Sequence, residues 1–304
     1  MARRPSPLRA LFAVALAAPG CGAADLSQTW QLDRLRVLGV QAEPAEIAPG
    51  EATALSSLVY VPTGARLDAQ IWFACLPTAA DDFGCALDTS ALDAFAALDP
   101  ATATPEELAA ALEAAQEAGL IGFEPFLPPR WVAPPDALDG LSAQEAREGV
   151  SALVNLSVAS SGPEAGEDDL ELVYKRVPVS LATTPNHNPL LIGLAVDGDL
   201  RHPEAETLVV KPGAEVEIEP ILSPDTIEDY VYITTDGEEE QRTEEPYFTW
   251  YAEGGGFEQA ISLYPDSARA WTAPDTVGFE GVIAVVVRDR RGGMHWTQLQ
   301  VRVE

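Results

Sequence analysis

The chain has 304 residues, enough for two domains that each bury a core, and its formal net charge is −30. A field this negative repels nucleic acid and anionic membrane surfaces, so no nucleic-acid partner is expected and membrane contact is expected only through a lipid anchor. The 25 prolines and 23 glycines are scattered between short apolar runs, which favours a turn-rich β protein over a disordered one.

The N-terminus has the pattern of an export signal. Three arginines precede an apolar run at residues 10–18. This run is too short to span a bilayer but suits the apolar segment of a secretory signal, so residues 1–20 are expected to be a signal peptide. In an ordinary secreted protein, cleavage would fall near Ala17 or Ala23.

A lone cysteine suggests that this signal is cleaved as in a bacterial lipoprotein. Cys21 follows Ala18-Pro19-Gly20, and a small residue before a single cysteine resembles the bacterial lipobox. The resemblance implies that Cys21 is lipidated and becomes the new N-terminus, with residues 21–32 as a tether. Gly22 in the next position resembles an outer-membrane sorting signal. The implied location is the outer membrane, with the protein facing the periplasm or the cell surface.

Two cysteines remain for the folded part of the chain, Cys75 and Cys85. An even pair in an exported protein predicts one disulfide that closes a small loop and stabilises the fold by about 2–3 kcal/mol. Two free buried thiols are the alternative. A metal site at this pair is less favoured, because the nearest histidine, His187, is distant in the sequence.

Short β-strands open the folded region. Apolar and polar residues alternate at 35–41, a Pro-Gly turn follows at 49–50, and alternation resumes at 55–59. A third apolar run at 69–75 has Trp72 at its centre. Trp72 is therefore expected to be a core anchor.

The period then changes to that of a helix. Thr104 and Glu107 form a capping box with Pro105 at the first helical position, and apolar residues recur at helical spacing until Gly119. This helix is expected within an insertion at about 77–129. Such an insertion either carries function or covers an open sheet edge.

More elements complete the first half of the chain. Ser142 and Glu145 form a second capping box, which predicts a short helix. A strand with one apolar face follows at 150–158. A last strand is expected at 170–181, where a change of apolar phase near Leu172 predicts a β-bulge.

The second half begins after a linker at 183–189. Clean alternation at 215–219 is typical of an antiparallel sheet with one solvated face. Residues 282–287 are apolar on both faces, as in a central strand. The acidic run at 236–240 is predicted to be a solvated loop.

A repeated pattern relates the two halves. Trp131 and Trp271 are each followed by Ala and Pro two and three positions later, and then by Glu-Gly-Val at the start of an apolar strand. Both tryptophans are therefore expected to be core anchors. Together with a Pro-Gly turn before an early strand in each half, the pattern resembles tandem Ig-like domains of exported bacterial lipoproteins. The resemblance implies an all-β fold of two tandem Ig-like antiparallel β-sandwiches, at residues 33–182 and 190–304, the first with a small helical insertion.

The sequence contains no recognisable catalytic pattern. It lacks the motifs of metalloproteases, of serine hydrolases and of phosphate-binding loops. His187, His202 and His295 have no implied acid–base partner and are expected to be structural or solvated. We therefore expect a protein that is not an enzyme and has no cofactor, with calcium as the one candidate ion.

Calcium is suggested by one short acidic turn. Asp197-Gly198-Asp199 resembles the turns that hold calcium between sandwich domains, which makes Asp197 and Asp199 candidate metal ligands. Asp-Gly is also an ordinary turn dipeptide.

Tyrosines give a second candidate surface. Tyr230 and Tyr232 share one strand face, and Tyr247 and Tyr251 share another. If the opposite apolar faces form the core, these rings line an outer sheet where a peptide or a sugar could stack. Tyrosine pairs that only stabilise the sheet are the alternative.

These observations predict a non-enzymatic exported lipoprotein that serves as an Ig-like spacer or as a protein-interaction or adhesion module of the cell envelope. The expected partner is another envelope protein or a glycan. The alternative is a calcium- or carbohydrate-binding module that uses the domain junction or the tyrosine face.

Overall fold

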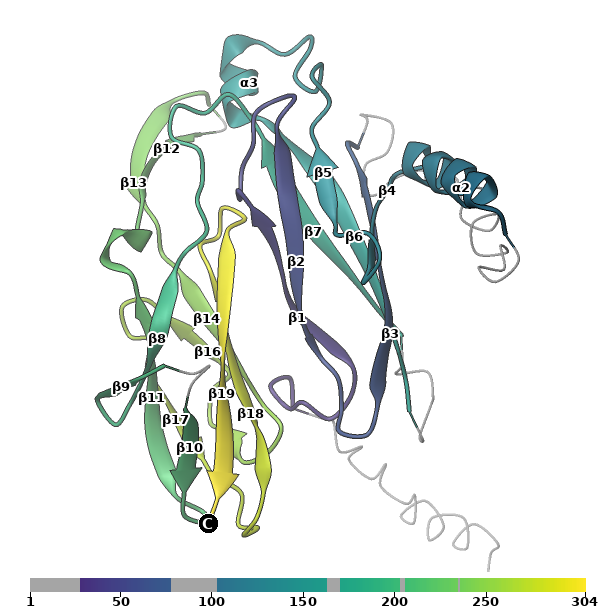
Figure 1. Ribbon diagram of the computed structural model, residues 1–304. Helices are drawn as coiled ribbons and strands as arrows, with labels where there is room; N and C mark the ends of the chain where they lie inside the picture. Colours follow the sequence, from purple (N-terminus) through teal and green to yellow (C-terminus); the bar gives the residue numbers. More distant parts are fainter. Residues whose placement is uncertain (1–27, 78–102, 163–169, 203–205, 235) are drawn as a thin grey trace, which may run out of the picture.

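The computed structural model describes residues 28–77, 103–162, 170–202, 206–234 and 236–304. The strands in these ranges form two β-sandwiches that lie side by side (Figure 1). The predicted all-β fold class is confirmed. The predicted signal peptide and Cys21 lie outside the described residues, and so does Cys85.

The first sandwich pairs a three-stranded sheet, in the order β1-β2-β5, with a four-stranded sheet, in the order β4-β3-β6-β7. All pairs in these two sheets are antiparallel. The elements in chain order are β1 (Arg36–Glu43), β2 (Ala52–Tyr60), β3 (Arg66–Cys75), α2 (Pro105–Glu117), β4 (Leu120–Glu124), β5 (Arg130–Val132), α3 (Ala143–Glu148), β6 (Val150–Ser161) and β7 (Leu170–Val179).

The second sandwich contains two five-stranded sheets, in the orders β10-β19-β18-β14-β16 and β15-β17-β11-β8-β9. β10 and β19 are parallel, and the other pairs are antiparallel. The elements are β8 (Leu191–Val196), β9 (Asp199–Arg201), β10 (Thr207–Val210), β11 (Glu215–Leu222), η3 (Pro224–Thr226), β12 (Asp229–Ile233), β13 (Glu239–Thr243), β14 (Tyr247–Ala252), β15 (Gly256–Phe257), β16 (Ile261–Leu263), β17 (Arg269–Thr272), β18 (Glu280–Arg288) and β19 (Met294–Val303).

A separate antiparallel hairpin, β12–β13, extends from the second sandwich. Figure 1 shows it beside the end of the first sandwich that carries α3. The β12–β13 hairpin and α3, which are far apart in the sequence, therefore border the same surface.

Each sandwich buries its own core around tryptophan. Trp72 and Trp131 lie in the first core, and Trp271 lies in the second. The indole N–H of Trp72 donates to Oε2 of Glu124 at 3.0 Å, and that of Trp271 donates to the backbone oxygen of Gly254 at 3.1 Å. Burial of these rings therefore leaves neither N–H unpaired, which avoids the cost of a lost hydrogen bond.

The two α-helices in the described part of the first sandwich begin with the expected caps. Thr104 Oγ1 accepts from the N–H of Glu107 at 3.2 Å, and Glu107 accepts from the N–H of Thr104 at 2.9 Å. Ser142 and Glu145 repeat the arrangement at 3.2 and 2.8 Å in α3. Each cap satisfies backbone donors that a helix leaves free, and is worth about 1 kcal/mol. The insertion is not helical throughout, because β4 adds a strand to the sheet.

One local prediction was wrong, and a second was correct only in part. β6 and β7 pair from end to end without a register shift, so β7 has no bulge. The change of phase arises because Leu170, Leu172 and Tyr174 are exposed on the outer face of β7. The acidic run at 236–240 is not a loop throughout, since Glu239 begins β13. Pairing with β12 there overrides the low strand preference of glutamate.

A shared apolar layer joins the two sandwiches. One face of β18 lies in the second core, and the other packs against β1 and β2, which explains why β18 is apolar on both faces. A bulge between Val37 and Gly39 turns Leu38 into the layer while Val37 and Val40 contact the first core. The buried residues of the layer are Leu32, Leu38, Leu58, Tyr60, Tyr251, Val282, Ala284 and Val286.

Among the described helices, none has the length and the apolar character needed to cross a membrane.

Candidate functional site

Directional hydrogen bonds supplement the shared apolar layer. The hydroxyl of Tyr60 donates to Oε1 of Glu253 across the junction at 2.7 Å. Nη2 of Arg288 donates to the backbone oxygen of Leu38, at the bulge of β1, at 2.8 Å. Apolar burial is non-directional, whereas these bonds have fixed geometry, so together they hold the sandwiches in one relative orientation.

Asp289 organises the turn between β18 and β19. Its Oδ1 accepts from the N–H groups of Arg291, Gly292 and Gly293 at 2.7, 2.9 and 2.9 Å. Its Oδ2 accepts from Nδ2 of Asn186, in the linker between the sandwiches, at 2.8 Å. Burial raises the pKa of the Asp289 carboxyl, and these donors oppose the shift. The turn thereby holds Arg291 next to the linker.

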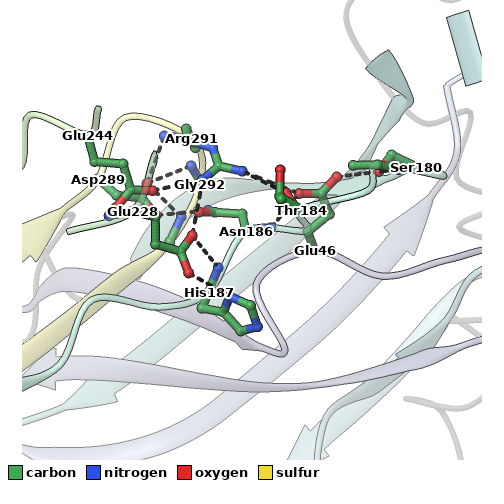
Figure 2. Close-up of polar contacts among 12 residues, drawn as sticks. Glu46, Ser180, Thr184, Asn186, His187, Glu228, Glu244, Asp289, Arg291 and Gly292 are labelled. Atoms are coloured by element: carbon green, nitrogen blue, oxygen red, sulfur yellow. Dashed lines mark hydrogen bonds and ion pairs between the residues drawn. The ribbon is translucent and has the colours of Figure 1, made fainter. Parts of the chain in front are cut away.

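Arg291 belongs to a group of ionic side chains, which we call the Arg291 cluster and which consists of Glu46, Glu228, Glu244 and Arg291 (Figure 2). Nη1 of Arg291 lies 3.1 Å from Oε2 of Glu228 and 3.0 Å from Oε1 of Glu244. Nη2 lies 4.0 Å from Oε2 of Glu46. Glu46 comes from the first sandwich and also accepts from the N–H of Asn186 at 2.7 Å. The cluster therefore bridges both sandwiches and the linker.

The Arg291 cluster holds three carboxylates around one guanidinium. Glu244 is its most deeply buried member, with a side chain that is 1% exposed. This burial raises the pKa of Glu244 to about 7, although the N–H of Glu228 and the charge of Arg291 act in the opposite direction. Glu244 therefore gains or loses its proton near neutral pH, and the charge of the cluster changes with it.

A cleft of about 410 Å³ opens beside the cluster. One wall is β12, which contributes the four consecutive residues 230–233. The other wall is formed by α3, the start of β6 and residues 182–184 at the start of the linker region, and Arg291 also lines the cleft. Nη2 of Arg147 on α3 lies 3.2 Å from Oε1 of Glu239 on β13. The volume is within the range of ligand-binding clefts, about 300–1,000 Å³.

The four candidate tyrosines do not form one open ligand surface. Tyr251 is 8% exposed and lies in the shared apolar layer. An arginine also lies over each ring, a contact worth about 0.5–2 kcal/mol that occupies a face a sugar would need. The guanidinium carbons lie 4.4 Å from the ring centre of Tyr230 (Arg291), 3.6 Å from Tyr232 (Arg242), 5.9 Å from Tyr247 (Arg288) and 5.7 Å from Tyr251 (Arg36).

Asp197 and Asp199 lie at the hairpin between β8 and β9. Asp197 has φ 49° and Gly198 has φ 86°, as expected where both central residues of a two-residue turn are left-handed. Oδ1 of Asp197 accepts from the N–H of Glu217 at 3.0 Å. In the described residues, no group of three or more His, Cys, Asp or Glu side chains could hold a metal ion. Calcium binding at this turn stays a prediction.

The cysteine and histidine residues considered in the sequence analysis lie in different environments. Cys75 ends β3 and is disulfide-bonded, while Cys85, its predicted partner, lies outside the described residues. Nδ1 of His187 lies 2.6 Å from Oε1 of Glu228. His295 lies in β19, where burial lowers its pKa.

Sequence reasoning missed the Arg291 cluster. Glu46 lies between β1 and β2, Glu228 and Glu244 flank the β12–β13 hairpin, and Arg291 lies in the last turn. No regular spacing connects these positions, and acidic residues are common throughout the chain. The one local signal is Asp289 before an Arg-Arg-Gly-Gly segment, because aspartate often accepts backbone hydrogen bonds in turns.

No family model matches the chain, and no curated protein matches it. A nucleoside hydrolase-related hypothetical protein from Saccharophagus degradans, associated with carbohydrate metabolism, is 17% identical over 40% of this chain and 26% of that chain, with a TM-score of 0.24. The three N-terminal domains of the Highly Immunogenic Outer Capsid protein of bacteriophage RB49 are 10% identical over 88% and 59%, with a TM-score of 0.22. Escherichia coli alpha-2-macroglobulin activated by porcine elastase is 10% identical over 91% and 22%, with a TM-score of 0.21. The chain spans less than two thirds of each of these structures, and such low TM-scores carry no argument about function.

Proposed function

We propose that the protein is a non-enzymatic, exported lipoprotein of the cell envelope that acts as a rigid spacer and protein-interaction module. The observation that supports this most is the junction, where the apolar layer is supplemented by the Tyr60–Glu253 and Arg288–Leu38 hydrogen bonds. A linker alone would leave the sandwiches free to reorient. A fixed junction instead keeps a binding surface at one distance and orientation from its anchor.

In this proposal a lipid on Cys21 supplies the anchor, and the segment that leads from Cys21 to Leu32 tethers the sandwiches to the outer membrane. The end of the predicted 21–32 tether belongs to the fold, because Leu32 is buried in the shared apolar layer and Trp30 packs against the second core. The support is the signal-like segment and the small residue before Cys21. Labelled palmitate is expected to enter the wild-type protein and not the Cys21→Ala form, which is released from the membrane. If neither form takes up the label and both are released from the membrane equally, Cys21 does not carry a lipid anchor.

The partner in this proposal is another protein of the envelope. The cleft beside the Arg291 cluster has walls from both sandwiches and the linker, so its shape depends on an intact junction. The net charge of −30 favours a partner with basic segments.

A matched pair of variants tests the role of the junction. Ala284 is fully buried in the shared layer, so Ala284→Glu places a carboxylate between the sandwiches. Gln300→Glu adds the same side chain at an exposed position of β19. Wild-type and Gln300→Glu proteins are expected to capture the same partner from envelope extracts, and Ala284→Glu is expected to lose it while retaining its β circular dichroism. Equal capture by all three forms would contradict the proposal.

The calcium- or carbohydrate-binding alternative has less support. The Asp197 carboxylate is engaged by the N–H of Glu217, and arginines lie over the tyrosine rings. Heat released on titration with calcium chloride, or retention on a glycan column, would favour this alternative instead.

A further inference from the structure

The cleft is bordered by a strand that has a partner on one side only. β12 pairs with β13, from Asp229 opposite Thr243 to Ile233 opposite Glu239. In an antiparallel ladder, pairs that exchange both backbone hydrogen bonds alternate with pairs whose N–H and C=O groups point outward. The bonds at the two ends of the hairpin show which residues belong to each kind.

The hydrogen bonds at both ends of the hairpin assign the same set of residues to the bonded pairs. The N–H of Glu244 donates to the oxygen of Glu228 at 2.9 Å, and the N–H of Thr234 donates to the oxygen of Glu238 at 2.9 Å. These residues all have even numbers, and the alternation has a period of two. The even-numbered residues of β12 therefore bond to β13, and the odd-numbered ones do not.

Among the cleft-lining residues 230–233, Val231 and Ile233 are thus the ones whose N–H and C=O groups point away from β13. Both residues line the cleft. Outside the ladder, the described part of the chain provides no hydrogen-bond partner for these backbone groups. An outward row of unpaired donors and acceptors is a template for another strand.

We infer that the cleft binds an extended basic peptide, which adds to the free edge of β12 as a third strand. Main-chain hydrogen bonds to Val231 and Ile233 hold the peptide, and the acidic side chains of the cleft select basic residues in it. The inference rests on the proposed role as a protein-interaction module and names the class of partner for that role.

The dimensions of the cleft fit such an occupant. The five residues of β12 extend over about 17 Å at the usual rise of a strand. The cleft volume of about 410 Å³ lies beside this edge. An extended segment of a few residues fits this space.

The charges of the cleft favour basic residues in the peptide. Its two arginines are already neutralised, Arg147 by Glu239 at 3.2 Å and Arg291 within its cluster. Glu148 also lines the cleft, and its hydrogen bond comes from the uncharged amide of Gln144 at 3.2 Å. Glu148 therefore offers a carboxylate to a lysine or arginine of the peptide, and the net charge of −30 attracts such a segment from solution.

Two other occupants fit these observations less well. A second copy of the chain carries the same charge of −30 and would be repelled. A sugar would need an open aromatic face, and arginines lie over Tyr230 and Tyr232.

The test uses fluorescein-labelled heptapeptides and the purified protein, with fluorescence anisotropy as the readout. One peptide alternates lysine and valine, and a second alternates glutamate and valine. Val231→Pro removes the outward N–H at the cleft edge. Gln241→Pro is its matched control, because Gln241 lies opposite Val231 and points its N–H out of the other edge of the hairpin. Neither substitution removes a bond of the β12–β13 ladder.

The lysine–valine peptide is expected to bind saturably. Val231→Pro should weaken its binding at least about tenfold, while Gln241→Pro changes it less than about twofold. Glu148→Lys should weaken the lysine–valine peptide and strengthen the glutamate–valine peptide. Glu113→Lys, on the exposed face of α2, makes the same charge change away from the cleft and should have little effect.

Several results would overturn the inference. They are absence of saturable binding, equal effects of the two proline variants, equal binding of the two peptides, or a concentration-dependent dimer that Val231→Pro abolishes. The partner-capture experiment distinguishes failure of the strand-addition inference from failure of the proposed spacer and interaction function. If Val231→Pro still captures the envelope partner and Ala284→Glu does not, the strand-addition site is wrong and the role of the junction stands.

Discussion

Nη1 of Arg291 lies 3.0 Å from Oε1 of Glu244, and the same nitrogen lies 3.1 Å from Oε2 of Glu228. The Glu244 side chain is 1% exposed, so water contributes little to solvating its charge. Removing one member of such a buried ion pair leaves the other uncompensated, which costs more than the pair itself contributes. Arg291 is therefore the residue on which the stability of the cluster depends.

Replacement of Arg291 should destabilise the protein in a pH-dependent way. Arg291→Met is expected to lower the free energy of unfolding by about 3–5 kcal/mol at pH 8, because Glu228 and Glu244 lose their counter-charge. The loss should be smaller at pH 5.5, where Glu244 holds a proton. Urea unfolding at both pH values measures the difference. Arg290→Met is the control, since Arg290 is 51% exposed and its 3.5 Å pair with Glu245 is worth less than about 1 kcal/mol. Equal losses for the two variants would contradict the role of the cluster.

Glu244 itself should make stability depend on pH between about 4.5 and 7. Burial raises its folded-state pKa from 4.5 to about 7, so in this window the folded protein holds a proton that the unfolded chain has released. Its contribution to stability is therefore complete below pH 4.5, falls as pH rises and is lost above about pH 7.

Glu244→Gln mimics the protonated form and removes this dependence. The Tm of the variant minus that of the wild type is expected to increase from pH 5 to pH 8. Glu245→Gln, at a neighbouring exposed side chain, should give a difference that does not vary with pH. A constant difference for Glu244→Gln as well would show that Glu244 keeps its ordinary pKa.

The cap of α3 supports the wall that carries Arg147 and Glu148. Ser142→Ala removes the acceptor for the N–H of Glu145 and should lower the free energy of unfolding by about 1 kcal/mol. Ser142→Asp keeps an acceptor there and should stay within a few tenths of a kcal/mol of the wild type. Urea unfolding compares the two variants, and an equal loss in both would mean that the cap does not stabilise the helix.

β18 shows what could be predicted of the fold and what could not. Its apolar residues on both faces indicate a central strand, and the structure places it between β14 and β19. The pattern cannot show what covers each face. The second face packs on Leu38 and Leu58, which come from the other sandwich, so the contact depends on tertiary arrangement and on the bulge in β1.

The candidate site was harder to predict, for a similar reason. Alternation places Tyr230 and Tyr232 on one face of β12, but it does not reveal Arg291 or Arg242 over their rings. Arg242 belongs to β13, a strand that was not predicted and whose first two residues were expected to be part of a solvated loop, and Arg291 comes from the last hairpin. Local sequence patterns report the period of an element, whereas ion pairs and cation–π contacts depend on which elements meet.

The most direct test of a fixed junction is the distance between the two sandwiches in solution. Spin labels at residues 130 on β5 and 219 on β11, attached through unnatural amino acids, report this distance by pulsed electron resonance. The wild-type protein is expected to give one narrow distance distribution, and Ala284→Glu a broad one. A broad distribution in the wild-type protein would contradict the rigid junction and the spacer role that depends on it.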